Sequence, residues 1–235
     1  MTVAVQQTQE AREADLLRRE VEVRALASQL IRSQENERIR LSRELHDDIG
    51  QRLCLVTLEV AMMVNHNSAI APSLIASLKE AQSSLNRLCA DVHELSHGLH
   101  SHKLELLGLK PALKDLCRRL SQGLLRVHLD ADQFEEPISK EVSLCLYRVA
   151  QEALNNVIRH SGSKTAVLTV TKIQNKLYLT IQDSGIGFDT STSSFGLGLL
   201  NMSERVKLVG GRLKIKSARE EGTTIWVEVT DGSAV

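Results

Sequence analysis

One imidazole in this sequence stands where it could act as a nucleophile. His46 is followed directly by the carboxylate of Asp47, and the amide of Gln51 comes one helical turn after that carboxylate. A neutral imidazole nitrogen is nucleophilic near neutral pH, and a neighbouring carboxylate can fix its tautomer and take up its proton. The same residues also fit an ordinary surface histidine on a charged helix face, so this segment alone leaves both interpretations open.

The segment around His46 has the periodicity of an amphipathic helix. Apolar side chains recur every three or four residues, at Leu41, Leu45, Ile49, Leu53, Val56, Val60 and Met63. They form one face of a helix. His46 lies off this stripe, so we expect its ring to be exposed. A glycine inside a helix costs about 1 kcal/mol relative to alanine, and Gly50 is expected to leave room above the ring for another molecule.

A second group of residues, far downstream, has the chemistry of a nucleotide site. Glu152 and Asn156 share a helix face and offer hard oxygen ligands of the kind that Mg²⁺ prefers. Three glycine-containing segments follow in order: Asp183-Ser184-Gly185-Ile186-Gly187, Gly196-Leu197-Gly198-Leu199 and Gly222-Thr223-Thr224. Glycine ahead of a helix lets backbone amides approach a phosphate. Each segment alone is weak, but their order and spacing together favour a phosphate-binding site.

Together these motifs resemble those of bacterial two-component sensor histidine kinases, in the class that pairs with NarL/LuxR-type response regulators. The resemblance covers roughly Gln34 to Val229. It implies a HisKA_3 dimerisation and phosphoacceptor domain followed by a HATPase_c domain. His46 would take the γ-phosphoryl group of Mg-ATP, with Asp47 as acid and base. The group would pass to an aspartate of the regulator, and Gln51 would position the water that dephosphorylates it.

The resemblance also implies a role for each residue of the nucleotide site. Asn156 would ligate Mg²⁺ with Glu152 beside the ion, and Asp183 would accept a hydrogen bond from the adenine amino group. A short lid, rich in serine and threonine, is expected from Asp189 to Phe195. The implied ATP contacts are Glu152, Asn156, Arg159, His160, Asp183, Gly185, Gly187, Gly196, Gly198, Leu199 and Thr223.

The periodicities predict an α+β protein in three parts. Residues 1–36 are a coiled-coil or signalling helix, because Leu16, Val23 and Leu30 recur every seven residues. Residues 37–108 form an antiparallel helical hairpin around a loop at 65–72. Its apolar stripe cannot be buried alone, so a homodimeric four-helix bundle is expected. Residues 109–235 form the ATP-binding domain, a layered α/β sandwich that the resemblance identifies as the Bergerat fold.

One motif points to different chemistry. His93-Glu94-Leu95-Ser96-His97 satisfies HExxH, which on a helix can bind zinc with the glutamate as general base. The helix already carries an apolar stripe through Val92, Leu95 and Leu99, and no third ligand follows at a familiar spacing. A zinc hydrolase is therefore a remote alternative. A phosphatase-biased or catalytically silent ATP-binding module is a nearer one.

Composition narrows the classes further. The formal net charge is zero, which argues against a nucleic-acid surface or a patch for anionic membranes. The sequence contains no apolar run of about 18 residues, so a cytoplasmic protein is expected. The four cysteines form no CxxC pair and are interpreted as reduced core residues. The segment before His46 is short and polar, so an upstream sensory partner is expected to supply the signal.

Overall fold

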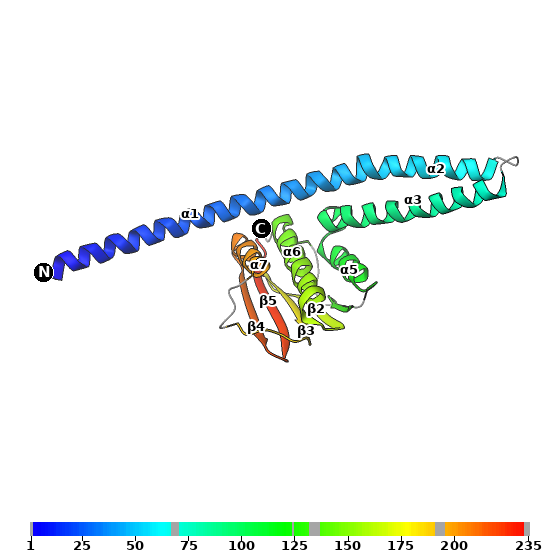
Figure 1. Cartoon of the computed structure of the whole chain (residues 1–235). Coiled ribbons are helices and arrows are strands. Elements are labelled where there is room, and N and C mark those ends of the chain that lie inside the picture. The colour runs from blue at the N-terminus through cyan, green and yellow to red at the C-terminus, as the bar shows by residue number, and fades with distance from the viewer. Residues whose placement is uncertain (1, 67–70, 124, 132–136, 191–195, 233–235) are drawn as a thin grey trace. The chain divides into compact units, whose positions relative to one another are not determined.

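The computed structural model describes residues 2–66, 71–123, 125–131, 137–190 and 196–232. The chain forms two compact units (Figure 1). One consists of Arg32–His102, and the other of Met1–Ile31 with Lys103–Val235.

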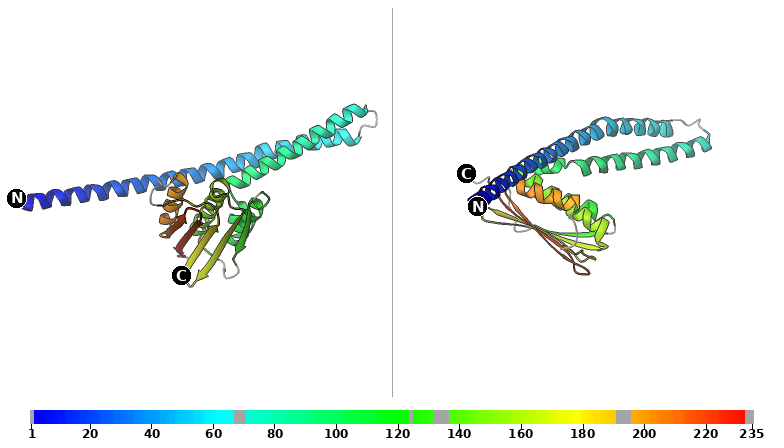
Figure 2. Two further views of the ribbon diagram at one scale, coloured as in Figure 1. Left: turned by 60° about the horizontal axis from the view of Figure 1, so that its bottom comes forward. Right: turned by 60° about the vertical axis from the view of Figure 1, so that its left-hand side comes forward.

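The Arg32–His102 unit, called the hairpin below, is helical in its described residues except Ala71, His100 and Ser101. It contains the end of α1 (Thr2–Arg43), the π-helical segment η1 (Glu44–Gly50), α2 (Gln51–His66) and α3 (Pro72–Leu99). In both views of Figure 2, α2 and α3 run side by side in opposite directions. The predicted helical hairpin is therefore present, while the centre of its predicted loop, residues 67–70, lies outside the described residues.

The π-helical segment interrupts the regular helix at the candidate nucleophile. A Cβ added to Gly50 would lie 3.3 Å from the carbonyl oxygen of Leu45, which is a tight contact. Glycine thus relieves a contact within the helix itself, a local role that the sequence did not indicate. Single-turn π segments occur frequently at functional sites.

Two buried serines tie the start of the hairpin to its end. The Oγ of Ser42 donates to the carbonyl oxygen of Ser96 at 3.0 Å, and the Oγ of Ser96 donates to the carbonyl oxygen of Ser42 at 3.0 Å. Both residues are almost fully buried. Because Ser42 precedes His46 by one turn and Ser96 lies between His93 and His97, this reciprocal pair fixes which histidines face one another.

Much of the hairpin's apolar surface remains open. The side chains of Leu55, Leu58 and Leu95 are 61%, 56% and 61% exposed. The other large apolar side chains that are exposed here are Ile49, Val56, Met62, Met63, Leu74 and Leu88. Cys54 is also exposed, so its interpretation as a core residue is wrong for the single chain.

The unit of Met1–Ile31 with Lys103–Val235 contains the expected ATP-binding domain and is called the ATP-domain unit below. It is built on a five-stranded sheet in the order β1-β2-β3-β5-β4. Its strands are β1 (Arg126–Asp130), β2 (Thr165–Ile173), β3 (Lys176–Asp183), β4 (Arg212–Ala218) and β5 (Gly222–Thr230). β1 pairs parallel to β2, and the other pairs are antiparallel. The helical segments are α4 (His102–Leu107), α5 (Leu109–Leu120), α6 (Lys140–Asn156), the π-helical segment η2 (Val157–Ser161) and α7 (Leu197–Leu208).

Helices α6 and α7 cover one face of this sheet (Figure 2). Side chains alternate along the central strands because successive residues point to opposite faces. Leu168, Leu179 and Val227 point into the core and are almost fully buried, whereas Trp226 is 39% exposed. Helix and sheet thus enclose one aliphatic core, which confirms the predicted α+β class and two-layer sandwich. Among the described helices, none combines the length and apolar character needed to cross a bilayer.

Candidate functional site

A cavity of about 610 Å³ opens in the ATP-domain unit where the end of α6 meets the sheet. A volume of this size is typical of small-molecule sites. The cavity is lined by Glu152, Ala153, Asn156, Val157, Arg159, His160, Ser161, Ile181, Asp183, Ile186, Gly187, Phe188, Gly196, Leu197, Gly198, Leu199, Thr223 and Ile225. All the predicted nucleotide-site residues except Gly185 are in this lining.

Two of the predicted residues come from the last turn of α6. Glu152 and Asn156 lie four apart on one helix and both face the cavity. Gly198 lies against them at the start of α7, where any Cβ would overlap the Glu152 carboxylate. The glycine therefore allows the start of α7 to lie close to the Glu152 side chain on α6. A carboxylate and an amide oxygen in one wall fit a hard cation such as Mg²⁺.

Asp183 is the buried acid of the cavity. It ends β3, is 7% exposed, and its Oδ1 accepts a 2.8 Å hydrogen bond from the amide of Gly185. Burial raises the pKa of this carboxyl, while hydrogen bonds from the amides of Gly185 and Thr223 act in the opposite direction. Those bonds fix the carboxylate, whose remaining acceptor capacity suits an exocyclic amine on a planar base.

The glycines after Asp183 allow close backbone contacts. A side chain at Gly185 would overlap Ser161, and Gly187 has a φ of +56° and sits against the backbone of Ala218. Gly185 therefore packs against Ser161, which lines the cavity, while Gly187 lines the cavity itself. These contacts are with the protein's own chain, so close passage of the backbone along a base stays a prediction.

The remaining predicted residues occupy opposite walls. Arg159 and His160 are exposed within η2 and present cationic and imidazole groups to the cavity. Gly196 and Leu199 flank the start of α7, and Thr223 lies directly across from Asp183 in the β3–β5 register. Of the predicted lid, residues 191–195 lie outside the described residues.

Two positioning serines were not anticipated. The carbonyl oxygen of Ser161 accepts from the amide of Ile186 at 2.9 Å, which ties the loop after β3 to η2. The Oγ of Ser217 accepts from the amide of Phe188 at 2.8 Å and lies 2.9 Å from the Oγ1 of Thr223. Neither the backbone bond at Ser161 nor the hydroxyl bonds at Ser217 leave a pattern in the sequence, so no signal could have identified these residues.

The hairpin holds the candidate nucleophile. His46, Asp47 and Gln51 are all exposed at or just after η1, which agrees with the expectation that the ring reaches solvent. The ring centroid of His46 lies 6.1 Å from those of both His93 and His102. In the sequence, His93 and His97 form a separate motif. Their proximity to His46 depends on how the hairpin folds.

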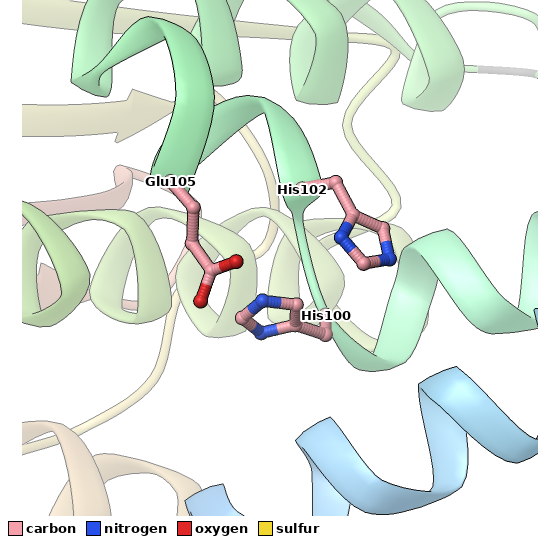
Figure 3. Close-up of side chains that lie close together, drawn as sticks. All are labelled: His100, His102 and Glu105. Carbon is pink, nitrogen blue, oxygen red and sulfur yellow. The ribbon is translucent and has the colours of Figure 1, made fainter.

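A further imidazole group follows where α3 ends. One ligand atom each from His100, His102 and Glu105 lies within 4.8 Å of the others (Figure 3). The three residues fall within six positions of the chain, so their proximity is local. His100 is almost fully buried and Glu105 is exposed.

The sheet, its covering helices and the cavity with a buried acid form a domain with a small-molecule site. Residues 141–232 match the family described as histidine kinase-, DNA gyrase B- and HSP90-like ATPase, HATPase_c. Residues 37–104, which include the HExxH segment, match the histidine kinase family HisKA_3. The chain belongs to the sensor histidine kinases that combine these two domains.

Relatives support this assignment along most of the chain. The sensor histidine kinase MctS of Rhizobium johnstonii is 35% identical over 208 residues, which cover 86% of this chain and 45% of that protein. The oxygen sensor histidine kinase NreB of Staphylococcus carnosus is 31% identical over 209 residues, 88% of this chain and 60% of that protein. The chain thus spans about half the length of these two relatives.

One solved structure is also similar to this chain. The blue-light activated histidine kinase EL346 of Erythrobacter litoralis aligns with a TM-score of 0.49 at 18% identity. The alignment covers 81% of this chain and 59% of that protein.

Proposed function

We propose that this chain is a protein-histidine kinase that phosphorylates its own His46 from Mg-ATP. It then transfers the phosphoryl group to an aspartate of a NarL/LuxR-type response regulator. The observation that carries this proposal is a nucleotide-sized cavity with a buried carboxylate, in a chain that also presents an exposed histidine on a HisKA_3 hairpin.

In the proposed first step, a neutral ring nitrogen of His46 attacks the γ-phosphorus of ATP. A nitrogen–phosphorus bond forms, the bond from the γ-phosphorus to the β–γ bridging oxygen breaks, and ADP leaves with that electron pair. The proton lost from the imidazole passes to Asp47, the neighbouring carboxylate. The protein contributes mainly by orienting the reactants and neutralising charge, as is general for phosphoryl transfer.

The cavity residues take the following proposed roles. Asp183 accepts from the adenine amino group, Thr223 holds a water beside the base, and Gly185 and Gly187 let the backbone pass along it. Asn156 and Glu152 hold Mg²⁺, which neutralises phosphate charge when bound. Arg159 and His160 lie toward the phosphates. Gly196, Gly198 and Leu199 close the phosphate side. The cavity lining that contains ten of these eleven residues supports the assignment.

The remaining proposals concern the assembly. The open apolar surface of the hairpin supports a homodimeric four-helix bundle, because a second copy would cover it. We keep the division into 1–36, 37–108 and 109–235 as a signalling helix, a dimerisation and phosphotransfer domain and an ATP-binding domain. Gln51 positions water for dephosphorylation of the regulator. Use of ATP as substrate supports a cytoplasmic site of action, with the signal supplied by an upstream sensory partner.

The deciding experiment is incubation with magnesium and γ-labelled ATP. The wild-type protein and a His128→Gln control, which changes an exposed histidine on β1, should both acquire acid-labile, base-stable label. His46→Gln should acquire none. Label that persists in His46→Gln would refute this acceptor. Absence of label in every protein despite ATP binding would favour the phosphatase-biased or silent module.

A further inference from the structure

The histidines of the HExxH segment lie beside the proposed phosphoacceptor. The Nε2 atoms of His93 and His97 are 3.1 Å apart, and their ring centroids are separated by 4.4 Å. His93 is exposed and His97 is half-buried. The His46 ring lies 6.1 Å from that of His93. Three imidazoles from two segments of the hairpin therefore gather at one place.

The spacing of the first two nitrogens suits a metal ion. Zinc binds imidazole nitrogen at about 2.0–2.1 Å, so two nitrogens 3.1 Å apart would subtend about 98° at a shared ion. This angle lies between the square and tetrahedral values, roughly 90° and 109°. The same two atoms can instead share one hydrogen bond, which needs a proton on one ring only. Zinc would use a lone pair from each ring.

His46 is within reach as a third ligand. Three imidazoles on one zinc ion place their ring centroids about 5 Å apart, so the His46 ring would have to move at least about 1 Å closer to His93 than it is now, and it would have to approach His97 as well. His46 is exposed, and the movement that the site requires is rotation about its side-chain torsions. The Ser42–Ser96 hydrogen bonds hold the two backbone segments in the register that makes this possible.

We propose that His93 and His97 bind a zinc ion, that His46 completes the site, and that the bound ion blocks autophosphorylation. The inhibitory half of this inference rests on the proposed function. A ring nitrogen that donates its lone pair to zinc cannot attack phosphorus, and the second ring nitrogen then carries a proton and is not nucleophilic. Magnesium prefers oxygen ligands and leaves this site to softer ions.

This site differs from the zinc hydrolase that HExxH suggests in sequence. The third ligand comes from the nucleophile of the kinase reaction, so the ion acts as a reversible inhibitor. A hydrolase would instead need its zinc to hold and activate a water. The motif would thus act as an inhibitory metal site inside the HisKA_3 domain that contains it.

The test is a zinc titration of the full chain, with any purification tag removed, by isothermal titration calorimetry without ATP. We expect one zinc per protomer for the wild type and for the His128→Gln control. Changing an outer-shell partner of a metal ligand already costs about 10- to 100-fold in affinity. The His93→Gln/His97→Gln double variant should lose at least as much, and His46→Gln should also bind more weakly.

One further variant and one further assay make the outcome decisive. Glu105→Gln, which alters the neighbouring group of potential ligands, should bind zinc like the wild type. Loss of binding in Glu105→Gln, or unchanged binding in the double variant, would overturn the site. Co²⁺ titration provides a visible absorption spectrum that reports nitrogen ligation independently of activity.

Labelling with γ-labelled ATP in excess magnesium tests inhibition. Zinc should abolish label in the wild type and in His128→Gln, and should not affect the His93→Gln/His97→Gln variant. Zinc binding at the site with undiminished label would overturn the inhibitory role. If no protein is labelled even without zinc, the proposed kinase function fails, while the calorimetric result still decides the metal site.

Discussion

The ATP-domain unit and the hairpin bury their apolar residues to very different extents. In the first, Leu168, Leu177 and Leu179 have no exposed surface, because helices cover the sheet. In the second, Leu55 and Leu58 are more than half exposed. The ATP-domain unit therefore contains a complete core, whereas the hairpin requires another surface to complete one.

The two units nevertheless share one local device. Each has a π-helical segment at residues with a proposed function: η1 contains His46, and η2 contains Arg159 and His160. A widened turn changes the direction of side chains. The proposed functional groups thus lie at departures from regular helix geometry, whether the surrounding core is closed or open.

The largest expected effect separates the two kinds of packing. Leu179→Ala removes a fully buried side chain and should lower the free energy of unfolding of the ATP domain by about 2–5 kcal/mol. Leu58→Ala, at a position of the hairpin that is exposed in the single chain, should change the free energy of unfolding of the ATP domain by less than about 0.5 kcal/mol. Denaturant titrations at several protein concentrations would measure both effects. An equal loss in the two variants would contradict the contrast between closed and open cores.

A second variant tests whether the ATP affinity of the closed unit is independent of self-association through the hairpin. Asp183→Asn replaces the fixed carboxylate with an amide that cannot accept at both oxygens. Hydrogen bonds to charged groups contribute about 1.5–3 kcal/mol, so ATP affinity should fall more than tenfold, measured by calorimetry. Asp130→Asn, at an exposed position on β1, is the matched control. Self-association should stay unchanged, since the hairpin is not altered.

A smaller effect is expected inside the open unit. Ser42→Ala and Ser96→Ala should each destabilise the hairpin by about 0.5–1.5 kcal/mol, the usual net contribution of a hydrogen bond. The double variant should cost less or more than the sum, because the two hydroxyls share one network. Ser77→Ala, which loses only an exposed bond within α3, serves as control. Strict additivity in the unfolding measurements would refute the reciprocal pair.

The smallest effect concerns pH. Because burial raises the pKa of Asp183, the folded domain binds a proton at this site more readily than the unfolded chain does. This group alone therefore makes the domain more stable below its folded-state pKa and less stable as the pH rises through it. ATP affinity should respond in the opposite sense, because adenine needs the carboxylate as acceptor. Affinity measured on lowering the pH should fall earlier than for an ordinary aspartate, whose pKa is about 3.9, and Asp183→Asn should lack this dependence.

The sequence predicted the elements best where one residue period was sustained. Alternation of apolar and polar residues predicts strands at 165–173 and 212–218, and both match β2 and β4 residue for residue, because one buried face enforces a period of two. Apolar residues every three or four positions predict a helix from about Ser73, one residue after the observed start of α3. Both results follow from burial, which selects residue type at every turn.

Features that depend on a single turn or bond escaped prediction. A π-helical segment shifts the apolar stripe too little to be recognised, so the sequence predicts ordinary α-helix where η1 and η2 occur. Ser161 and Ser217 act through backbone atoms brought close only by the folded sheet. The ATP cavity was anticipated because glycine and acidic residues mark its walls, whereas the encounter of His46 with His93 depends on the hairpin's register.

The widened turn of η1 also bears on how such kinases diversify. A π-helical turn accommodates one more residue than an α-helical turn, so a helix entering at Arg43 and the helix leaving at Gln51 need not keep one unbroken seven-residue count. We expect this joint to absorb a one-residue difference in the length of whatever is fused upstream, by exchanging a π turn for an α turn. Upstream segments whose lengths differ by one residue would then join the same hairpin without disrupting its helices.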